Sequence, residues 1–202
     1  MPDEETLTKG ERTHRAVMDA AYRLFMEQGF HATSMRQIAD RAGLALGGIY
    51  NHFASKEEVF GAVMAERHPF HQIIPLLATT EGATVEDFVH NAARRMVDEL
   101  VHHPDFFNLM LIEVIEFKGQ HMPKLFEALF PQLMEIAQRF AQAEGKVRPI
   151  PPLLLMRAFL GMFFSYYVTQ ILIGDLMPPE IQGSALDTFA EIFLHGVLEN
   201  DG

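Results

Sequence analysis

Residues 44–60 read LALGGIYNHFASKEEVF. Two adjacent glycines, Gly47 and Gly48, stand directly before a cluster of large side chains at 49–53. Each glycine weakens a helix by about 1 kcal/mol relative to alanine. Ser55 and Glu58 then have the spacing of a capping box, which opens a new helix. The stretch predicts a short helix followed by a longer one, and the paired glycines indicate that the backbone there must approach another group closely.

The residues before this stretch also have a helical pattern. Residues 8–28 carry apolar side chains at helical spacing, and Gly29 is placed as the C-terminal stop. Ser34 and Gln37 have the spacing of a second capping box. We therefore expect a long first helix and then a short helix that ends in a turn at Gly43.

Two short helices joined by a glycine-containing turn predict a helix-turn-helix, whose second helix lies in the major groove of DNA. Ala39 and Ala42 are small enough for the two helices to cross closely. Leu44, Ile49 and Phe53 supply the inward face. The predicted outward face offers backbone, an amide and an imidazole: Ala45, Gly47, Gly48, Asn51 and His52.

The rest of the chain reads as helices separated by prolines, with no long alternation of apolar and polar residues. The sequence therefore predicts an all-α fold of about nine helices. The apolar-rich stretches lie at roughly 84–102, 105–118, 122–143, 152–173 and 183–199.

Charge is distributed unevenly along the chain. The net charge is −11, yet residues 6–68 carry a balance of +1 and residues 69–202 a balance of −9. A phosphate responds to the local patch, because screening in physiological salt acts over about 8 Å. Composition therefore permits DNA binding by the first third and disfavours it elsewhere. The absence of cysteine excludes disulfides, and the charged N-terminus has no apolar core typical of a secretory signal. We expect a cytoplasmic protein.

Residues 153–173, LLLMRAFLGMFFSYYVTQILI, have about the length of a membrane span. Arg157 and Gln170 interrupt the segment, and Tyr166 and Tyr167 fall at its middle, where a span would keep them at its ends. The favoured interpretation is a helix buried on one face by its own domain and on another by a partner subunit. A membrane span is the alternative.

Residues 10–60 resemble the N-terminal domain of the TetR family of bacterial transcriptional repressors. The resemblance covers about a quarter of the chain without a gap. The matching residues are Leu24-Phe25, Gly29-Phe30, Thr33 to Ala39, Ala42-Gly43-Leu44, Gly47, Ile49 to Phe53 and Ser55 to Glu58.

The resemblance implies DNA-contacting roles at the start of the first short helix. Thr33, Ser34 and Arg36 stand where a hydroxyl, a guanidinium and free amides can hold a phosphate. Ala45 departs from the serine or threonine that is common in the family, so we expect the next helix to lack a side-chain cap.

The resemblance also implies roles around the glycine pair. Gly47 would bring its amide against the sugar-phosphate backbone, where a side chain would hold the backbone away. Tyr50 and His52 would contact phosphates, and Lys56 would bind another phosphate together with the N-terminus of its helix. Asn51 is the candidate for base reading, because its amide can pair bidentately with adenine.

The resemblance implies a division of the chain into a DNA-binding domain at 1–54 and a helical domain at 55–202 that binds a ligand and dimerises. Helices near 153–173 and 184–198 would form the homodimer as a four-helix bundle. A small lipophilic effector would lower the affinity of the dimer for a palindromic double-stranded operator. The candidate pocket residues are Phe88, Phe106, Phe107, Met110, Phe163, Tyr166, Tyr167 and Gln170.

The alternative from another functional class is a metal-dependent enzyme. Glu99 and His103 are helix neighbours, and further candidate ligands lie nearby in the sequence: His102, Glu113, Glu116 and His121. No HExxH or similar metal-binding spacing occurs, and the chain has no phosphate-cradling glycine loop or nucleophile elbow. We therefore expect neither a catalytic site nor a metal or cofactor.

Overall fold

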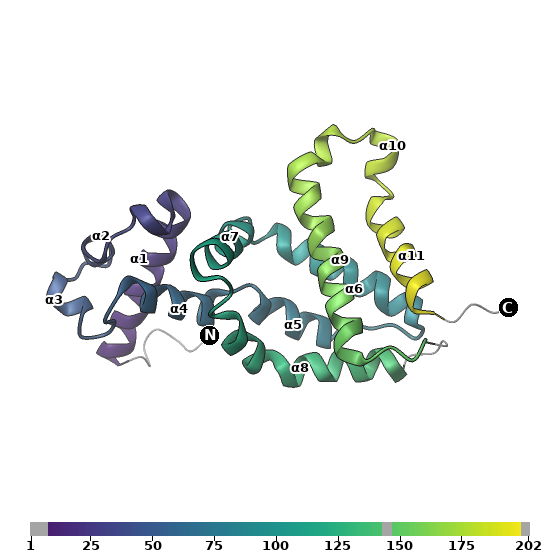
Figure 1. The fold of residues 1–202 in the computed structure, drawn as a ribbon, viewed down its shortest axis with the longest axis horizontal. Helices are drawn as coiled ribbons and strands as arrows, with labels where there is room; N and C mark the ends of the chain where they lie inside the picture. The colour runs from purple at the N-terminus through teal and green to yellow at the C-terminus, as the bar shows by residue number, and fades with distance from the viewer. Residues whose placement is uncertain (1–7, 143–146, 199–202) are drawn as a thin grey trace. The chain divides into compact units, whose positions relative to one another are not determined.

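A computed structural model of the chain describes residues 8–142 and 147–198 (Figure 1). In these residues the secondary structure is helical, without strands, and an isolated β-bridge joins Val147 and Leu198. The predicted all-α fold is confirmed. The chain divides into two compact units, Met1–His68 with Asp105–Phe126, and Pro69–Pro104 with Glu127–Gly202.

The first unit holds the N-terminal helices and one helix from the middle of the chain. Its helices are α1 (Lys9–Ala32), α2 (Met35–Arg41), α3 (Leu46–Ile49), α4 (Lys56–Arg67) and α7 (Phe106–Phe117). The core forms because α1 places apolar side chains on one face, where α2, α4 and α7 pack against it. Phe25, Phe30 and Phe60 meet at the centre, with ring centroids 5.5–5.7 Å apart.

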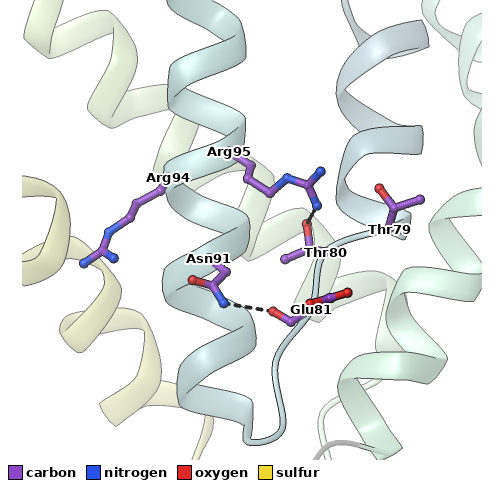
Figure 2. A pocket seen from close by; sticks show the side chains of 6 residues that line it. All are labelled: Thr79, Thr80, Glu81, Asn91, Arg94 and Arg95. Carbon is purple, nitrogen blue, oxygen red and sulfur yellow. Dashed lines mark hydrogen bonds between the residues drawn. The ribbon is translucent and has the colours of Figure 1, made fainter.

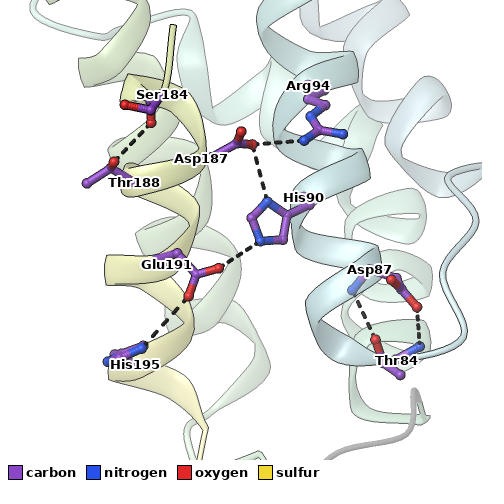
Figure 3. A network of polar contacts seen from close by, with 9 residues as sticks. All are labelled: Thr84, Asp87, His90, Arg94, Ser184, Asp187, Thr188, Glu191 and His195. Atoms are coloured by element: carbon purple, nitrogen blue, oxygen red, sulfur yellow. Dashed lines mark hydrogen bonds and ion pairs between the residues drawn. The ribbon is translucent and has the colours of Figure 1, made fainter. Parts of the chain in front are cut away.

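The second unit is built around α6. Its elements are α5 (Phe70–Ala78), α6 (Val85–Val101), most of α8 (Met122–Gln142), α9 (Pro152–Ile173), η2 (Gly174–Leu176), α10 (Pro179–Gln182) and α11 (Ala185–Val197). Helix α6 packs against α5, α9 and α11, and α9 packs against α11. A polar seam also joins α6 to α11 (Figure 3). In it Arg94 donates to Asp187 over 2.9 Å, and the His90 ring lies 3.1 Å from Glu191 and 3.5 Å from Asp187.

The predicted helices agree with the observed ones at most boundaries. Gly29 is non-helical at φ 81° and ψ 171°, which confirms the expected stop although the last turn of α1 continues to Ala32. Two helices were missed. Helix α5 contains Pro75, and this proline suggested that no helix would continue through it. Helix α10 is a single turn that begins at Pro179.

Helix α9 is apolar on nearly all sides, and its own unit covers only part of it. Phe159 and Phe163 face the core, whereas Leu154, Ile171 and Leu172 are more than half exposed. By length and composition alone, the segment Pro152–Leu176 could cross a membrane.

Candidate nucleic-acid interface

The junction between α1 and α2 is fixed by side chains that cap backbone groups. The Thr33 hydroxyl donates to the carbonyl of Gly29 over 2.8 Å and accepts from the side-chain amide of Gln28 over 3.2 Å. The predicted capping box is present, because the Ser34 hydroxyl accepts from the amide of Gln37 while the Gln37 side chain accepts from the amide of Ser34. Thr33 is 2 % exposed. The hydroxyl of Thr33 therefore serves the fold and faces inward, unlike the exposed Ser34.

The turn between α2 and α3 follows the predicted pattern. Gly43 adopts φ 71°, a conformation that side-chain-bearing residues rarely take. This allows the amide of Leu44 to donate to the carbonyl of Ala39 over 2.9 Å. Ile49 and Phe53 are buried, as the sequence predicts.

Helix α3 is one turn long and begins without help from a side chain. Ala45 is its N-cap and makes no side-chain cap bond, as the departure from the family pattern predicts. A Cβ atom added at Gly47 or Gly48 would meet no atom of this chain within 4 Å. The packing of this unit therefore gives no reason for either glycine, although both weaken the helix.

The side chains after Gly48 form a polar surface. Tyr50 is 52 % exposed although it is aromatic. Asn51 is exposed and His52 is half-buried. Arg36, in the first turn of α2, is exposed as well. A turn with a bare backbone, an amide, a phenol and an imidazole offers hydrogen-bond donors to an outside partner and little apolar area.

Lys56 behaves differently from the other predicted contacts. Its ammonium group donates to the carbonyls of Phe30 and Thr33 over 2.6 and 2.7 Å. It also lies 4.2 Å from the centre of the Phe30 ring. Burial lowers the pKa of the Lys56 ammonium below its ordinary value. Lys56 therefore ties the start of α4 to the end of α1, a contact that sequence spacing could not reveal.

The start of α4 departs from the predicted capping box. The Ser55 hydroxyl accepts from the amide of Glu58 over 3.2 Å, so half of the box is present. The Glu58 carboxylate accepts instead from the amide of Ala54 over 2.6 Å. The expected return bond to Ser55 is replaced by one to the preceding residue.

Comparison with known proteins identifies the family of this fold. The bacterial regulatory proteins of the tetR family match residues 17–63. The HTH-type transcriptional regulator TtgW of Pseudomonas putida is 39% identical over 104 residues, which are 48% of this chain and 78% of that protein. The chain belongs to the TetR family.

Similarity to TetR-family proteins extends beyond the N-terminal helices. The HTH-type transcriptional regulator YvkB of Bacillus subtilis (strain 168) is 21% identical over 187 residues, 92% of this chain and 97% of that protein. The fatty acid degradation regulator FadR from Bacillus halodurans shares the fold with a TM-score of 0.69 at 17% identity, over 93% of this chain and 97% of that chain. The chain is thus a helix-turn-helix transcriptional regulator with the all-α architecture of this family.

The residues predicted to line an effector pocket fall in both compact units. Phe106, Phe107 and Met110 lie on α7 in the first unit. Phe106 is buried against His68, whose Nε2 lies 3.2 Å from the sulfur of Met110. Phe88, on α6, is buried in the second unit.

The α9 members of the predicted pocket line the core of the second unit, except at the end of the helix. Phe163 is fully buried, and Tyr166 meets Phe189 at 5.2 Å between ring centroids. Burial raises the pKa of the Tyr166 phenol. The Tyr167 hydroxyl donates to the carbonyl of His103 over 3.5 Å, and Gln170 is exposed. A pocket that gathers all eight residues stays a prediction.

A polar depression of about 410 Å³ that the sequence did not reveal lies beside the α5–α6 loop (Figure 2). Side chains hold this loop in place: Arg95 donates to the hydroxyl of Thr80 over 3.2 Å, and Asn91 donates to the carbonyl of Glu81 over 2.9 Å. The adjacent arginines Arg94 and Arg95 in an acidic region were the available signal. Figure 2 shows that they point to opposite sides of α6.

The residues considered for a metal site pair off in separate places. His103 lies 3.2 Å from Glu99, and His121 lies 2.8 Å from Glu113. Glu116 lies 2.6 Å from His31. Within residues 8–142 and 147–198, no three His, Asp or Glu side chains are arranged to hold a metal ion. The relatives reported above are named as transcriptional regulators.

Proposed function

We propose that this chain is a cytoplasmic, ligand-responsive repressor that binds a palindromic DNA operator as a homodimer and is released by a small lipophilic effector. The observation that carries the proposal is the outer face of α3. Two glycines weaken the helix there, and a Cβ atom on either would meet nothing in the chain. Such a position is explained when an outside partner needs the bare backbone.

The chemistry of this face fits a duplex better than a protein partner. The Gly47 amide can lie against a phosphate, and Tyr50 and His52 can donate to neighbouring phosphates. The side-chain amide of Asn51 can accept a hydrogen bond from an adenine and donate one to it in the major groove. At the start of α2, Ser34 and Arg36 are exposed and can contact a further phosphate.

We assign Thr33 and Lys56 a supporting part in DNA binding. Both side chains have partners inside the unit: Thr33 is bonded to Gly29, and Lys56 to the carbonyls of Phe30 and Thr33. A direct phosphate contact by Lys56 would require its ammonium to leave two carbonyls. These residues therefore hold α2 and α4 in place, and the free amides at the helix starts contact the phosphates.

The homodimer is proposed to form through α9 and α11. Leu154, Ile171 and Leu172 on α9 and Ile192 on α11 are each more than half exposed. Large apolar side chains that share a surface mark an interface, because burying them gains about 25 cal/mol per Å². The same reasoning favours a subunit interface over a membrane span for Pro152–Leu176. A two-fold dimer would present two α3 turns to half-sites about 34–36 Å apart, or somewhat farther.

The effector is proposed to bind among the aromatic side chains of the helical region. Phe88, Phe163, Tyr166 and Tyr167 supply apolar surface in the second unit, with two phenols as polar handles. Binding there would shift the dimer towards a spacing of the two α3 turns that no longer fits both half-sites.

The test is to isolate the DNA that the purified protein retains. Random-sequence duplexes are passed over the protein for several rounds, the enriched duplexes are sequenced, and the best one is footprinted beside the DNA upstream of the protein's own gene. We expect an inverted repeat with protected half-sites about one helical turn apart. If no sequence is enriched over the starting pool, the chain is not an operator-binding repressor.

A further inference from the structure

The turn after α7 brings two ionisable side chains of the first unit, one before the turn and one after it, next to each other. Lys118 adopts φ 53° and Gly119 φ 81°, so the backbone leaves α7 through two consecutive left-handed residues. The amide of Gly119 donates to the carbonyl of Glu113 over 3.2 Å. The reversal places His121 beside Glu113, eight positions earlier in the sequence.

Glu113 and His121 form a tightly held pair. The Glu113 side chain is completely buried, which is costly for a carboxylate unless it is bonded. One of its oxygens accepts from the backbone amide of His121 over 2.7 Å, and the other lies 2.8 Å from Nδ1 of the His121 ring. Since a carboxylate accepts, Nδ1 carries the proton, and the orientation of the imidazole is fixed.

The imidazole of His121 is pressed against α4. A Cβ atom at Gly61 would lie 2.9 Å from Cδ2 of His121, closer than real contacts allow. The ring also packs edge-on against Phe60 and Phe117, at 5.7 and 4.8 Å between centroids. Helix α4 therefore approaches the ring as closely as a glycine permits, and the position of the ring limits the position of the helix.

Direct contacts continue from this pair to the start of α2. Phe117 stacks on Phe60 at 4.6 Å and meets Phe30 edge-on at 4.9 Å. Lys56 lies over Phe30 and donates to the carbonyls of Phe30 and Thr33. Thr33 is the residue before the N-cap of α2. Each step is a contact within the same compact unit.

We propose that Glu113 and His121 are positioning residues for DNA binding: by fixing α4 at Gly61 they set α2 and α3 in the arrangement that fits a duplex. The inference rests on the proposed function and names two residues outside the DNA-binding face that support it. A change in DNA affinity when the pair is mutated measures this coupling.

The test compares four variants, and a fifth as a core control, on the best duplex obtained from the random-sequence selection. Glu113→Leu removes both bonds to His121, whereas Glu113→Gln can keep both if the imidazole proton moves to Nε2. Gly61→Ala pushes the His121 ring away while both members of the pair keep their chemical identity. Gly183→Ala adds a methyl group directly after α10, outside α9 and α11, where a Cβ atom would meet nothing within 4 Å, and is the matched control.

We expect Glu113→Leu and Gly61→Ala each to raise the Kd for the duplex about tenfold, because both move the ring that limits the position of α4. Glu113→Gln should fall between wild type and Glu113→Leu, and Gly183→Ala should bind as wild type does. Dimer content is measured by light scattering, and all titrations are made well below each melting temperature. The measured Kd then reflects the arrangement of α2 and α3 in folded protein, because unfolded protein and a changed dimer content do not contribute.

Two results would overturn the inference while leaving the proposed function intact. One is binding of Gly61→Ala and Glu113→Leu within about twofold of wild type, a difference of under about 0.5 kcal/mol. The other is an equal rise in Kd for Val63→Ala at an equal loss of melting temperature. Val63 is a buried residue of α4 two positions after Gly61, and therefore lies on another face of the helix. Failure of the wild-type protein to enrich any duplex would instead remove the proposed function, and this inference with it.

Discussion

The outer face of α3 in the first unit and the exposed side of α9 and η2 in the second present opposite kinds of surface. The first unit presents backbone and polar groups at Gly47 and Asn51, and the second presents large apolar side chains such as Leu172 and Leu176, which are 62% and 78% exposed. Backbone amides left open attract anions, whereas exposed leucines are stabilised by another apolar surface. The contrast is the one expected of the two proposed partners, a nucleic acid at α3 and a second copy of the chain at α9.

The largest expected effect is a loss of stability when a charge is placed on the buried side of α9, compared with the same charge on its exposed side. Phe163→Asp places a charge at a fully buried position, and we expect a loss of at least about 4 kcal/mol, enough to unfold the second unit. Circular dichroism and thermal melting measure this loss. The matched change Leu172→Asp, on the exposed side of the same helix, should leave the fold intact and convert the dimer to monomer.

Light scattering measures whether the Leu172→Asp variant is a monomer or a dimer. A dimeric Leu172→Asp variant would move the subunit interface away from this end of α9. A stably folded Phe163→Asp variant would contradict the burial of that side chain.

The next largest effect concerns DNA binding by the first unit. Tyr50→Ala removes a phenol that is half exposed and not needed for the core, so the melting temperature and the dimer should be unchanged. We expect the Kd for the selected duplex to rise about a hundredfold, because one phosphate contact is lost in each of two subunits. Electrophoretic mobility shift measures the change. A Kd equal to that of wild type would show that the assigned face is wrong.

The glycines of α3 allow a prediction in which stability and affinity change in opposite directions. Gly47→Ala should raise the free energy of unfolding by up to about 1 kcal/mol, because alanine favours the helix and its methyl group meets nothing. The same methyl group should raise the Kd for DNA about tenfold by holding the backbone away from the phosphate. Gly48→Ala is the matched control, with the same gain in stability and a smaller loss of affinity. Equal affinity for Gly47→Ala and wild type would leave the glycine unexplained.

Local signals made much of the first unit predictable. The box at Ser34 and Gln37, the turn at Gly43 and the inward side chains of Ile49 and Phe53 each depend on spacing within a few residues, and the structure confirms all of them. Helix α5 was missed, because Pro75 suggested a break although tertiary packing of a strongly apolar segment maintains the helix.

Contacts between distant parts of the chain were beyond the reach of the sequence. Lys56 has the pattern of a free cation at a helix start, and only the fold brings the carbonyls of Phe30 and Thr33 to its ammonium. The pairing of Glu113 with His121 likewise depends on a left-handed turn at Lys118. The sequence had offered both side chains as candidate metal ligands, and Glu113 also as a polar group of the effector pocket, and nothing in it paired the two.

The smallest expected effect tests the polar seam between α6 and α11 (Figure 3). The hydrogen bond from Arg94 is the main cause that lowers the pKa of Asp187 below its ordinary value of 3.8, and His90 contributes further. A carboxyl whose pKa is lower in the folded state stabilises the fold above its unfolded pKa, and this stability is lost as the pH falls through the folded value. Asp187→Asn should therefore lower the melting temperature near pH 7.

The size of this effect is limited because the pair is exposed to solvent. We expect at most about 1 kcal/mol, and less in high salt. The difference between Asp187→Asn and wild type should shrink as the pH is lowered below 3.8, where the wild-type carboxyl also becomes neutral. Asp40→Asn, an exposed carboxylate of the first unit, is the control. A difference that stays constant from about pH 7 to about pH 2.5 would mean that Asp187 contributes through packing, and that charge does not hold α11 on α6.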